Sequence, residues 1–282
     1  MAGYATHEIK YIFVLTQERT GSNLLCSALG DYENMRNLGE FFSVANSDPA
    51  ISKDEFTEEE TVAMYKHLNT GAHQQFHNKI GSKQSDLNTV NMGFEQIRTN
   101  PKPALDWMSE MPRIKIIKYQ DSLWAGQQKR LSDVGLDHLQ RRPDSLYIIL
   151  DRKDHLAQYV SGQIALENNA WIHKNTNDHK VTLRVDHYDH WLYQKLQYYG
   201  TLYTRCPDER VLKITYEEHL IDGLNQALIE KINEFFALWK VDTRYMGTFN
   251  DAIQRQSTVP AIEKIKSYNY DYWKPVRGPE GH

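Results

Sequence analysis

The feature that most constrains the fold is the run from Tyr11 to Leu25, which reads YIFVLTQERTGSNLL. It begins as a short apolar stretch rich in β-branched and aromatic residues, the pattern of a buried strand. A polar turn follows, and a helical pattern then starts with LLCSAL. A strand, a tight turn and a helix in this order can cradle a phosphate-like anion, because the turn presents backbone N–H groups and the helix presents its positive end.

The side chains of the turn suit an anion. Arg19 supplies a fixed positive charge with forked donors, and Gly21 lets the backbone approach a ligand closely. Thr20, Ser22 and Asn23 add side-chain hydrogen bonds. The alternative is an ordinary strand–turn–helix in which Thr20 or Ser22 is the N-cap residue.

The turn does not match the two common nucleotide-binding motifs. A Walker A loop needs G-x-x-x-x-G-K-[ST], but Thr16 stands where the first glycine would be, and Ser22 follows Gly21 without a lysine. A dinucleotide G-x-G-x-x-G is absent as well. Both an Mg-ATP P-loop and a dinucleotide site therefore fit poorly.

The loop resembles the 5′-phosphosulfate loop of sulfotransferases, and most of all that of the bacterial trehalose-sulfotransferase-like family, P-R-T-G-S-T-x-L. Here residues 18–25 read ERTGSNLL, so Glu18 and Asn23 replace the Pro and the second Thr of the family. The charge of Glu18 would repel an anion if it pointed toward the ligand. The resemblance implies that the cofactor 3′-phosphoadenosine-5′-phosphosulfate (PAPS) is bound by Arg19, Thr20, Gly21, Ser22, Asn23 and Leu24.

A second segment carries the same resemblance. SLYIIL at 145–150 predicts a strand, and it runs directly into DRKDHLAQYVS at 151–161, a predicted helix that reaches about residue 169. The family has R-R-D-x-x-x-Q-A-x-S here, which implies that Arg152 and Ser161 hold the 3′-phosphate of the cofactor. An arginine at a helix start opposes the helix dipole, which favours a bound anion over a plain surface charge.

Two residues are candidates for the catalytic base. Glu40 comes about one strand–helix crossover after Arg19, so it can return to the same end of the sheet. It resembles the glutamate that follows the first helix in the family, and the alternative is an exposed or capping carboxylate. His173, next to Trp171 and after the second helix, resembles a Trp-His pair that would contact a sugar-like acceptor. The alternative there is a packed tryptophan and a surface histidine.

The remaining pattern predicts an α/β fold. Further strands are expected at 114–119 and from residue 210, and helices at about 57–70, 86–99, 131–141, 185–205 and 223–239. Residues 34–42 are expected to be a loop, and residues 43–112 a helical insertion that covers the site or grips the acceptor. Four apolar strands separated by helices predict a mostly parallel sheet covered on both faces, with Arg19 and Arg152 at its carboxyl edge.

Arg255 and Gln256 resemble a late nucleotide-binding segment of the family, and a plain C-terminal loop is the alternative.

Composition narrows the function classes. The net charge of −4 gives no sign of nucleic-acid binding, and two cysteines make no disulfide framework. We found no signal peptide, membrane-length apolar run, repeat or linker, so the expectation is one cytoplasmic domain over residues 1–282. A homodimer is compatible with the sequence. Asp186, His187, Asp189 and His190 lack a third ligand at metal-binding spacing, so no metal is expected.

The resemblance implies a P-loop-NTPase-like sulfotransferase fold. The expected reaction moves the sulfuryl group of PAPS to a hydroxyl of a small, carbohydrate-like acceptor and leaves adenosine 3′,5′-bisphosphate (PAP). One alternative is an atypical ATP-dependent small-molecule kinase. It is disfavoured by the missing Gly-Lys-Ser/Thr and by the lack of a clear strand-end aspartate for Mg²⁺, because Asp151 is the only one and it adjoins Arg152. The other is a nucleotide-binding protein without catalysis. Three departures from the sulfotransferase pattern keep it open: Glu18, Asn23, and His219, which stands where the family's Y-E-D-L element has Asp.

Overall fold

The computed structural model describes residues 7–39, 101–121, 142–168, 176–247 and 260–269. Its centre is a five-stranded sheet in the order β2-β3-β1-β4-β6, and every neighbouring pair is parallel. The strands are β1 (Tyr11–Gln17), β2 (Met35–Asn37), β3 (Ile114–Asp121), β4 (Ser145–Asp151) and β6 (Val211–Thr215). The predicted parallel sheet flanked by helices is confirmed.

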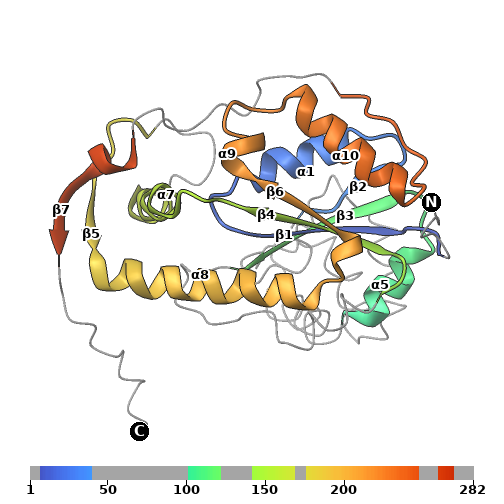
Figure 1. Cartoon of the computed structure of the whole chain (residues 1–282), viewed down its shortest axis with the longest axis horizontal. Coiled ribbons are helices and arrows are strands. Elements are labelled where there is room, and N and C mark those ends of the chain that lie inside the picture. The colour runs from blue at the N-terminus through green and yellow to red at the C-terminus, as the bar shows by residue number, and fades with distance from the viewer. Residues whose placement is uncertain (1–6, 40–100, 122–141, 169–175, 248–259, 270–282) are drawn as a thin grey trace, which may run out of the picture.

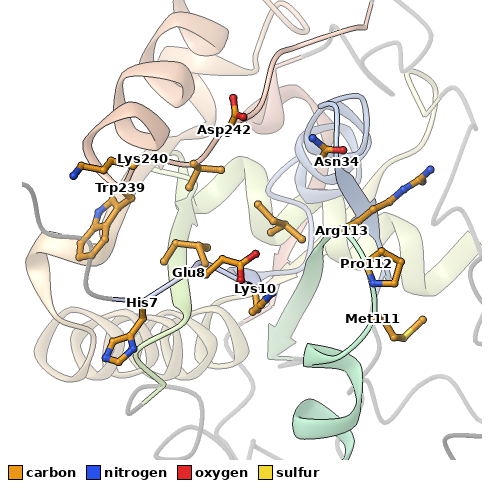
Figure 2. Close-up of a pocket in the computed structure, with 13 residues that line it drawn as sticks. His7, Glu8, Lys10, Asn34, Met111, Pro112, Arg113, Trp239, Lys240 and Asp242 are labelled. Atoms are coloured by element: carbon orange, nitrogen blue, oxygen red, sulfur yellow. Dashed lines mark ion pairs between the residues drawn. The ribbon is translucent and has the colours of Figure 1, made fainter.

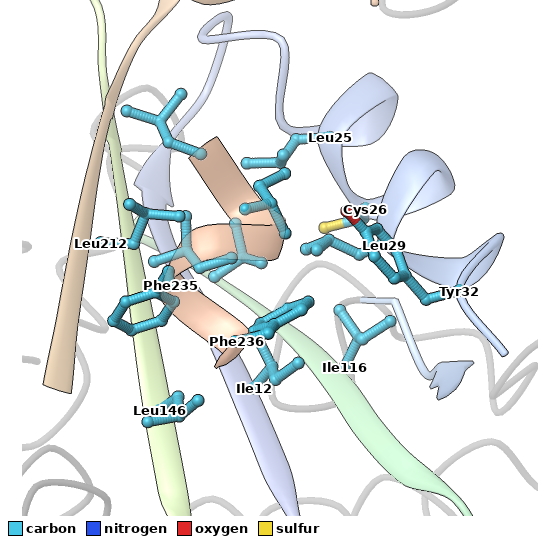
Figure 3. Packing of buried hydrophobic residues seen from close by; sticks show 14 of the residues in the cluster. Ile12, Leu25, Cys26, Leu29, Tyr32, Ile116, Leu146, Leu212, Phe235 and Phe236 are labelled. Atoms are coloured by element: carbon cyan, nitrogen blue, oxygen red, sulfur yellow. The ribbon is translucent and has the colours of Figure 1, made fainter. Parts of the chain in front are cut away.

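Helices cover both faces of the sheet (Figure 1). One face carries α1 (Ser22–Gly30) and α10 (Gln226–Leu238), and the other carries α5 (Lys102–Ser109) and α8 (Val185–Arg205). Alternate residues of β1 point to opposite faces. Ile12 therefore packs with Leu25 and Phe236 (Figure 3), while Phe13 joins the cluster on the α5 and α8 side. Burial on both faces explains why the strand is continuously apolar.

The strand order changes direction at β1. The chain goes from β1 to β2 and β3 on one side of it, and then to β4 and β6 on the other. The chain therefore leaves β1 and β4 in opposite directions at the carboxyl edge of the sheet, which is where parallel sheets bind ligands. Helix α7 (His155–Asn168) lies across this edge and is seen nearly end-on in Figure 1, at the opposite end of the sheet from the label N.

Three short strands differ from expectation. Met35–Asn37, expected as a loop, is the edge strand β2, and three residues are too few to show a strand period. β5 (Val181–Arg184) and β7 (Ile265–Asn269) pair in parallel as a separate two-stranded sheet. Their apolar residues Val181 and Ile265 pack on α7, so tertiary contacts hold these strands together.

Helix α5 lies inside the segment that was expected to be an insertion. Pro103 stands in the first turn of α5, where a missing N–H costs nothing. Leu105 and Met108 are fully buried, and Tyr11 donates a hydrogen bond to the Leu105 carbonyl. This part of 43–112 therefore belongs to the core. The helices expected at 57–70, 86–99 and 131–141 lie outside the described residues.

Further short elements complete the described chain: α9 (Tyr216–His219) and the 3-10 helices at Asp208–Arg210 and Ala261–Lys264. Among the described helices, none has both the length and the apolar character needed to span a bilayer.

The cap of α10 gives a stability prediction. The Asn225 side chain accepts a hydrogen bond from the Leu228 N–H at 2.9 Å. Asn225→Ala is expected to lower the free energy of unfolding by about 1 kcal/mol, because a first-turn donor loses its acceptor. Urea unfolding measures this. Asn225→Ser keeps a capping oxygen and should stay close to the unsubstituted protein; equal losses in both variants would contradict the capping role.

Candidate anion site

The turn between β1 and α1 is tight and contains two residues in the left-handed region. Arg19 and Gly21 both adopt positive φ angles, 63° and 83°, and Gly21 is the N-cap of α1. The first N–H groups of a helix have no acceptor within it. The loop after β1 therefore points its helix start, Ser22, to the carboxyl edge of the sheet, as the sequence predicts.

Several side chains of this loop make their contacts inside the protein and do not face a ligand site. The Thr20 hydroxyl is fully buried, lies 2.6 Å from Thr16 Oγ1 and donates to the Gln17 carbonyl at 2.9 Å. Leu24 belongs to the core beneath α1. Thr20 and Leu24 can therefore serve a ligand only through their backbone N–H groups. Asn23 is exposed, and its Oδ1 accepts from Lys118 Nζ at 2.5 Å.

The structure brings Arg19, Arg152 and Ser161 together. Arg152 NH1 donates to the Arg19 carbonyl at 3.0 Å, and Arg19 Nε donates to Ser161 Oγ at 3.0 Å. Ser161 reaches this point because α7 crosses the sheet edge. Burial, followed by repulsion from Arg152, lowers the pKa of Arg19 to about 10, so this side chain is still charged at neutral pH. Two cations held so close form a site that an anion would stabilise.

Arg152 is held from the end of β6. Its guanidinium carbon lies 4.7 Å from the centre of the Tyr216 ring, and its Nε lies 3.7 Å from Glu217 Oε1. The Glu217 carboxylate also accepts from the N–H groups of Lys153 and Asp154, at 2.9 and 3.0 Å. Glu217 therefore fixes the turn that starts α7.

The sequence reading missed two lysines near the site. Lys118 is buried in β3 beside the loop, and Lys195 in α8 is fully buried at 2.9 Å from Asp151 Oδ1. Each carried a readable signal. Lys118 interrupts an apolar strand, and Lys195 stands in the apolar stripe between Trp191 and Tyr199. A lysine on a buried face needs a polar partner, which makes it a candidate for a structural or functional role.

The other predicted site residues lie outside the described residues: Glu40, Trp171, His173, Arg255 and Gln256. Gly39, which precedes Glu40, is described. Its carbonyl accepts from the Lys118 N–H at 2.8 Å. Since Lys118 also contacts Asn23, the chain leading to Glu40 runs along the strand beside the loop.

One expectation about strand ends was wrong. β3 continues to Asp121, which stands in register with Gln17 at the carboxyl end of β1. Asp151 is therefore not the one strand-end aspartate. The Asp151 carboxylate itself binds Lys195 Nζ and accepts from the Arg152 N–H at 2.7 Å, so it is already engaged by the protein.

A separate cleft of about 570 Å³ lies at the opposite, amino edge of the sheet (Figure 2). Residues 7–10, 111–114 and 239–242 line it. Its charges are mixed, and Lys10 pairs with Glu8 at 2.7 Å. The three residues Arg19, Arg152 and Ser161 do not line it. Within the described ranges, no group of three or more His, Cys, Asp or Glu side chains could hold a metal ion.

Gly21 gives a prediction with an internal control. A Cβ at Gly21 would lie 3.0 Å from the Tyr216 ring, on a backbone with φ of +83°. Gly21→Ala is expected to lower the free energy of unfolding by about 1–2 kcal/mol, because the left-handed conformation and the contact both oppose a side chain. Gly200→Ala on α8 meets open space and should stabilise by about 0.5–1 kcal/mol. Chemical denaturation measures both, and a shift of the same sign in the two variants would contradict the account.

Comparison with known proteins gives few matches. No protein-family model matches the chain, and no curated protein matches it. Solved structures do resemble it, among them two sulfotransferases. The sulfotransferase domain of the Synechococcus PCC 7002 olefin synthase has a TM-score of 0.43 and 15% identity, over 92% of this chain and 82% of that one. Sulfotransferase STF1 from Mycobacterium tuberculosis H37Rv has a TM-score of 0.39 and 10% identity, over 83% and 68%. Both TM-scores lie below 0.5, so the function proposed below rests on residues of this chain.

Proposed function

We propose that this chain is a PAPS-dependent sulfotransferase that acts on a hydroxyl of a small, carbohydrate-like acceptor. The observation that carries the proposal is the meeting of Arg19, Arg152 and Ser161 at the switch point of the sheet, beside the start of α1. Parallel α/β sheets bind ligands at such a point. The sequence motifs around Arg19 and Arg152 support the same reading.

The two basic loops suit a ligand with two anionic groups. In this proposal the N–H groups at the start of α1, together with Arg19, form one centre. Arg152 forms the other with Ser161, whose Oγ accepts from Arg19 Nε in this structure. PAP carries a phosphate on each of two ribose carbons, whereas a single phosphate would need one of these centres alone. In the proposed complex, the first centre binds the 5′-phosphosulfate end and the second binds the 3′-phosphate.

The proposed chemistry is sulfuryl transfer by positioning and charge stabilisation. The acceptor oxygen forms a bond to sulfur, while the bond from sulfur to the bridging phosphate oxygen breaks. Negative charge grows on that bridging oxygen, where Arg19 and the loop N–H groups can stabilise it. The acceptor proton goes to a base, for which Glu40 is the first candidate and His173 the second.

Arg152→Ala tests the assignment of the 3′-phosphate. Loss of charge-assisted hydrogen bonds should weaken PAP binding about 10–100-fold, since each is worth roughly 1.5–3 kcal/mol. AMP, which lacks the 3′-phosphate, should bind both proteins alike. Calorimetric titration measures the two dissociation constants. Lys153→Ala, which removes an exposed neighbour paired with Glu218, is the matched control, and an equal loss of AMP affinity in Arg152→Ala would refute the assignment.

One observation favours a second candidate, an ATP-dependent small-molecule kinase. Asp121 ends β3 in register with Gln17, and a strand-end aspartate beside a phosphate loop is a common magnesium ligand. The engagement of Asp151 by Lys195 argues against Asp151 in that role. Incubation with a carbohydrate panel and either ³⁵S-labelled PAPS or ³²P-labelled ATP separates the candidates by the label transferred. Nucleotide binding without any transfer would favour the non-catalytic alternative.

A further inference from the structure

Lys195 is the charged residue among the buried side chains of α8, where it lies with Trp191, Tyr199 and Leu202. Its side chain has no exposure. Its ammonium group contacts four acceptors: Asp151 Oδ1 at 2.9 Å, His155 Nδ1 at 2.9 Å, Gln158 Oε1 at 2.8 Å and the Arg152 carbonyl. The aromatic rings of Trp191 and Tyr199 flank it, with centroids 5.9 and 5.4 Å from Nζ.

These acceptors all belong to the segment that carries Arg152. Asp151 ends β4, Arg152 follows it directly, and His155 and Gln158 lie in the first turns of α7. Gln158 extends the network to the other loop, because its Nε2 donates to the Glu18 carbonyl at 2.7 Å while its Oε1 faces Lys195. Glu18 directly precedes Arg19. The Lys195 ammonium group is thus connected to the Arg152 backbone by a direct hydrogen bond. It is connected to the Glu18 backbone by two successive hydrogen bonds through the Gln158 amide.

We propose that Lys195 is a positioning residue that sets the spacing between the Arg19 and Arg152 loops. It does so through the Arg152 carbonyl on one side and the Gln158 amide on the other. The lysine orients that amide, since the Oε1 end faces a donor and the Nε2 end is left to face the Glu18 carbonyl. The inference deepens the proposed function, and its ligand measurement rests on that function.

A purely structural role makes a different prediction. A buried Lys195–Asp151 pair that only stabilised the fold would lower stability when removed, without coupling to Gln158 in ligand binding. A positioning role requires that Lys195 and Gln158 act through one path. The loss of either then moves the Arg19 loop, and the loss of both adds little to the larger single effect.

The experiment is a double-mutant cycle with PAP as the ligand. The variants are Gln158→Met, Lys195→Met and the double substitution, with Lys213→Met, an exposed lysine of β6, as control. Titration is done well below the unfolding temperature of each variant. We expect each single variant to weaken PAP binding by at least about tenfold, because small displacements of positioned groups are costly. We expect the double variant to match the weaker single variant, and Lys213→Met to match the unsubstituted protein.

Hydrogen exchange without ligand keeps the inference separable from the proposed function. In Lys195→Met, amides of residues 15–24 and 150–158 should both exchange faster, while those of α10 should not change. In Gln158→Met, which keeps the Lys195–Asp151 pair, residues 15–24 should exchange faster.

Independent, multiplicative losses of PAP affinity, or unchanged exchange in both loops, would overturn the inference. Failure of the unsubstituted protein to bind PAP would overturn the proposed function instead, and the exchange data would then decide the role of Lys195. If Lys195→Met does not fold, Gln158→Met decides it by the same two measurements.

Discussion

Replacing Arg19 with alanine is expected to lower kcat/KM for sulfuryl transfer by about 10²–10³-fold, the usual cost of removing one donor that stabilises developing negative charge. Arg19 is partly buried, charged and held by Ser161 at the carboxyl edge of β1. Its low accessibility to water strengthens its interaction with an anion. A steady-state assay with PAPS and an accepted sugar measures the effect.

The backbone conformation at Arg19 means that the alanine substitution adds no new backbone strain. Arg19 has a φ of 63°, and alanine meets the same steric cost there, since both residues carry a Cβ. Arg19→Lys keeps the charge without the forked donors and should lie between the alanine variant and the unsubstituted enzyme. Arg205→Ala removes an exposed arginine at the end of α8 and should change nothing. Unchanged turnover in Arg19→Ala would remove Arg19 from the reaction.

Replacing Glu40 with glutamine is expected to lower kcat by about 10²–10⁴-fold, the range of general-base catalysis. PAP affinity should stay unchanged, because the base contacts the acceptor hydroxyl and not the nucleotide. The preceding residue, Gly39, is hydrogen-bonded to the backbone of Lys118, whose side chain binds Asn23 in the anion loop. Gly39 therefore lies against β3, the strand next to β1.

Two comparisons complete this test. Glu33→Gln removes an exposed carboxylate from the connection between α1 and β2 and should leave kcat intact. Normal turnover in Glu40→Gln would rule out Glu40 as the base. In that case, His173→Gln should show the loss of kcat instead.

Much of the architecture could be read from the sequence, because long elements carry strong periodic signals. The apolar strands at 114 and 145 and the helix at 185–205 lie where they were expected. Arg19 and Arg152 could be brought together by topology alone, since both follow parallel strands that end at one edge. The sequence did not indicate that Ser161 would contact Arg19 directly, because this depends on how α7 crosses that edge.

The missed features depend on tertiary contacts. β2, β5 and β7 have three to five residues each. Such segments pair because neighbours bury them, as α7 helps to bury Val181 and partly buries Ile265. Asp121 was placed beyond its strand because a polar end carries no periodic signal. Lys195 was hidden by the aromatic stripe around it, although a charge in such a stripe is itself a signal.

The most direct test of the central claim compares PAP with Mg-ATP as stabilising ligands. A ligand present at about 100 times its Kd adds about 2.7 kcal/mol to the free energy of unfolding, which a thermal-shift measurement detects easily. The account predicts that PAP raises the melting temperature, that AMP raises it less, and that Mg-ATP leaves it unchanged. Stabilisation by Mg-ATP alone would contradict the sulfotransferase assignment and favour the kinase, and stabilisation by none of the three would contradict an anion site at Arg19 and Arg152.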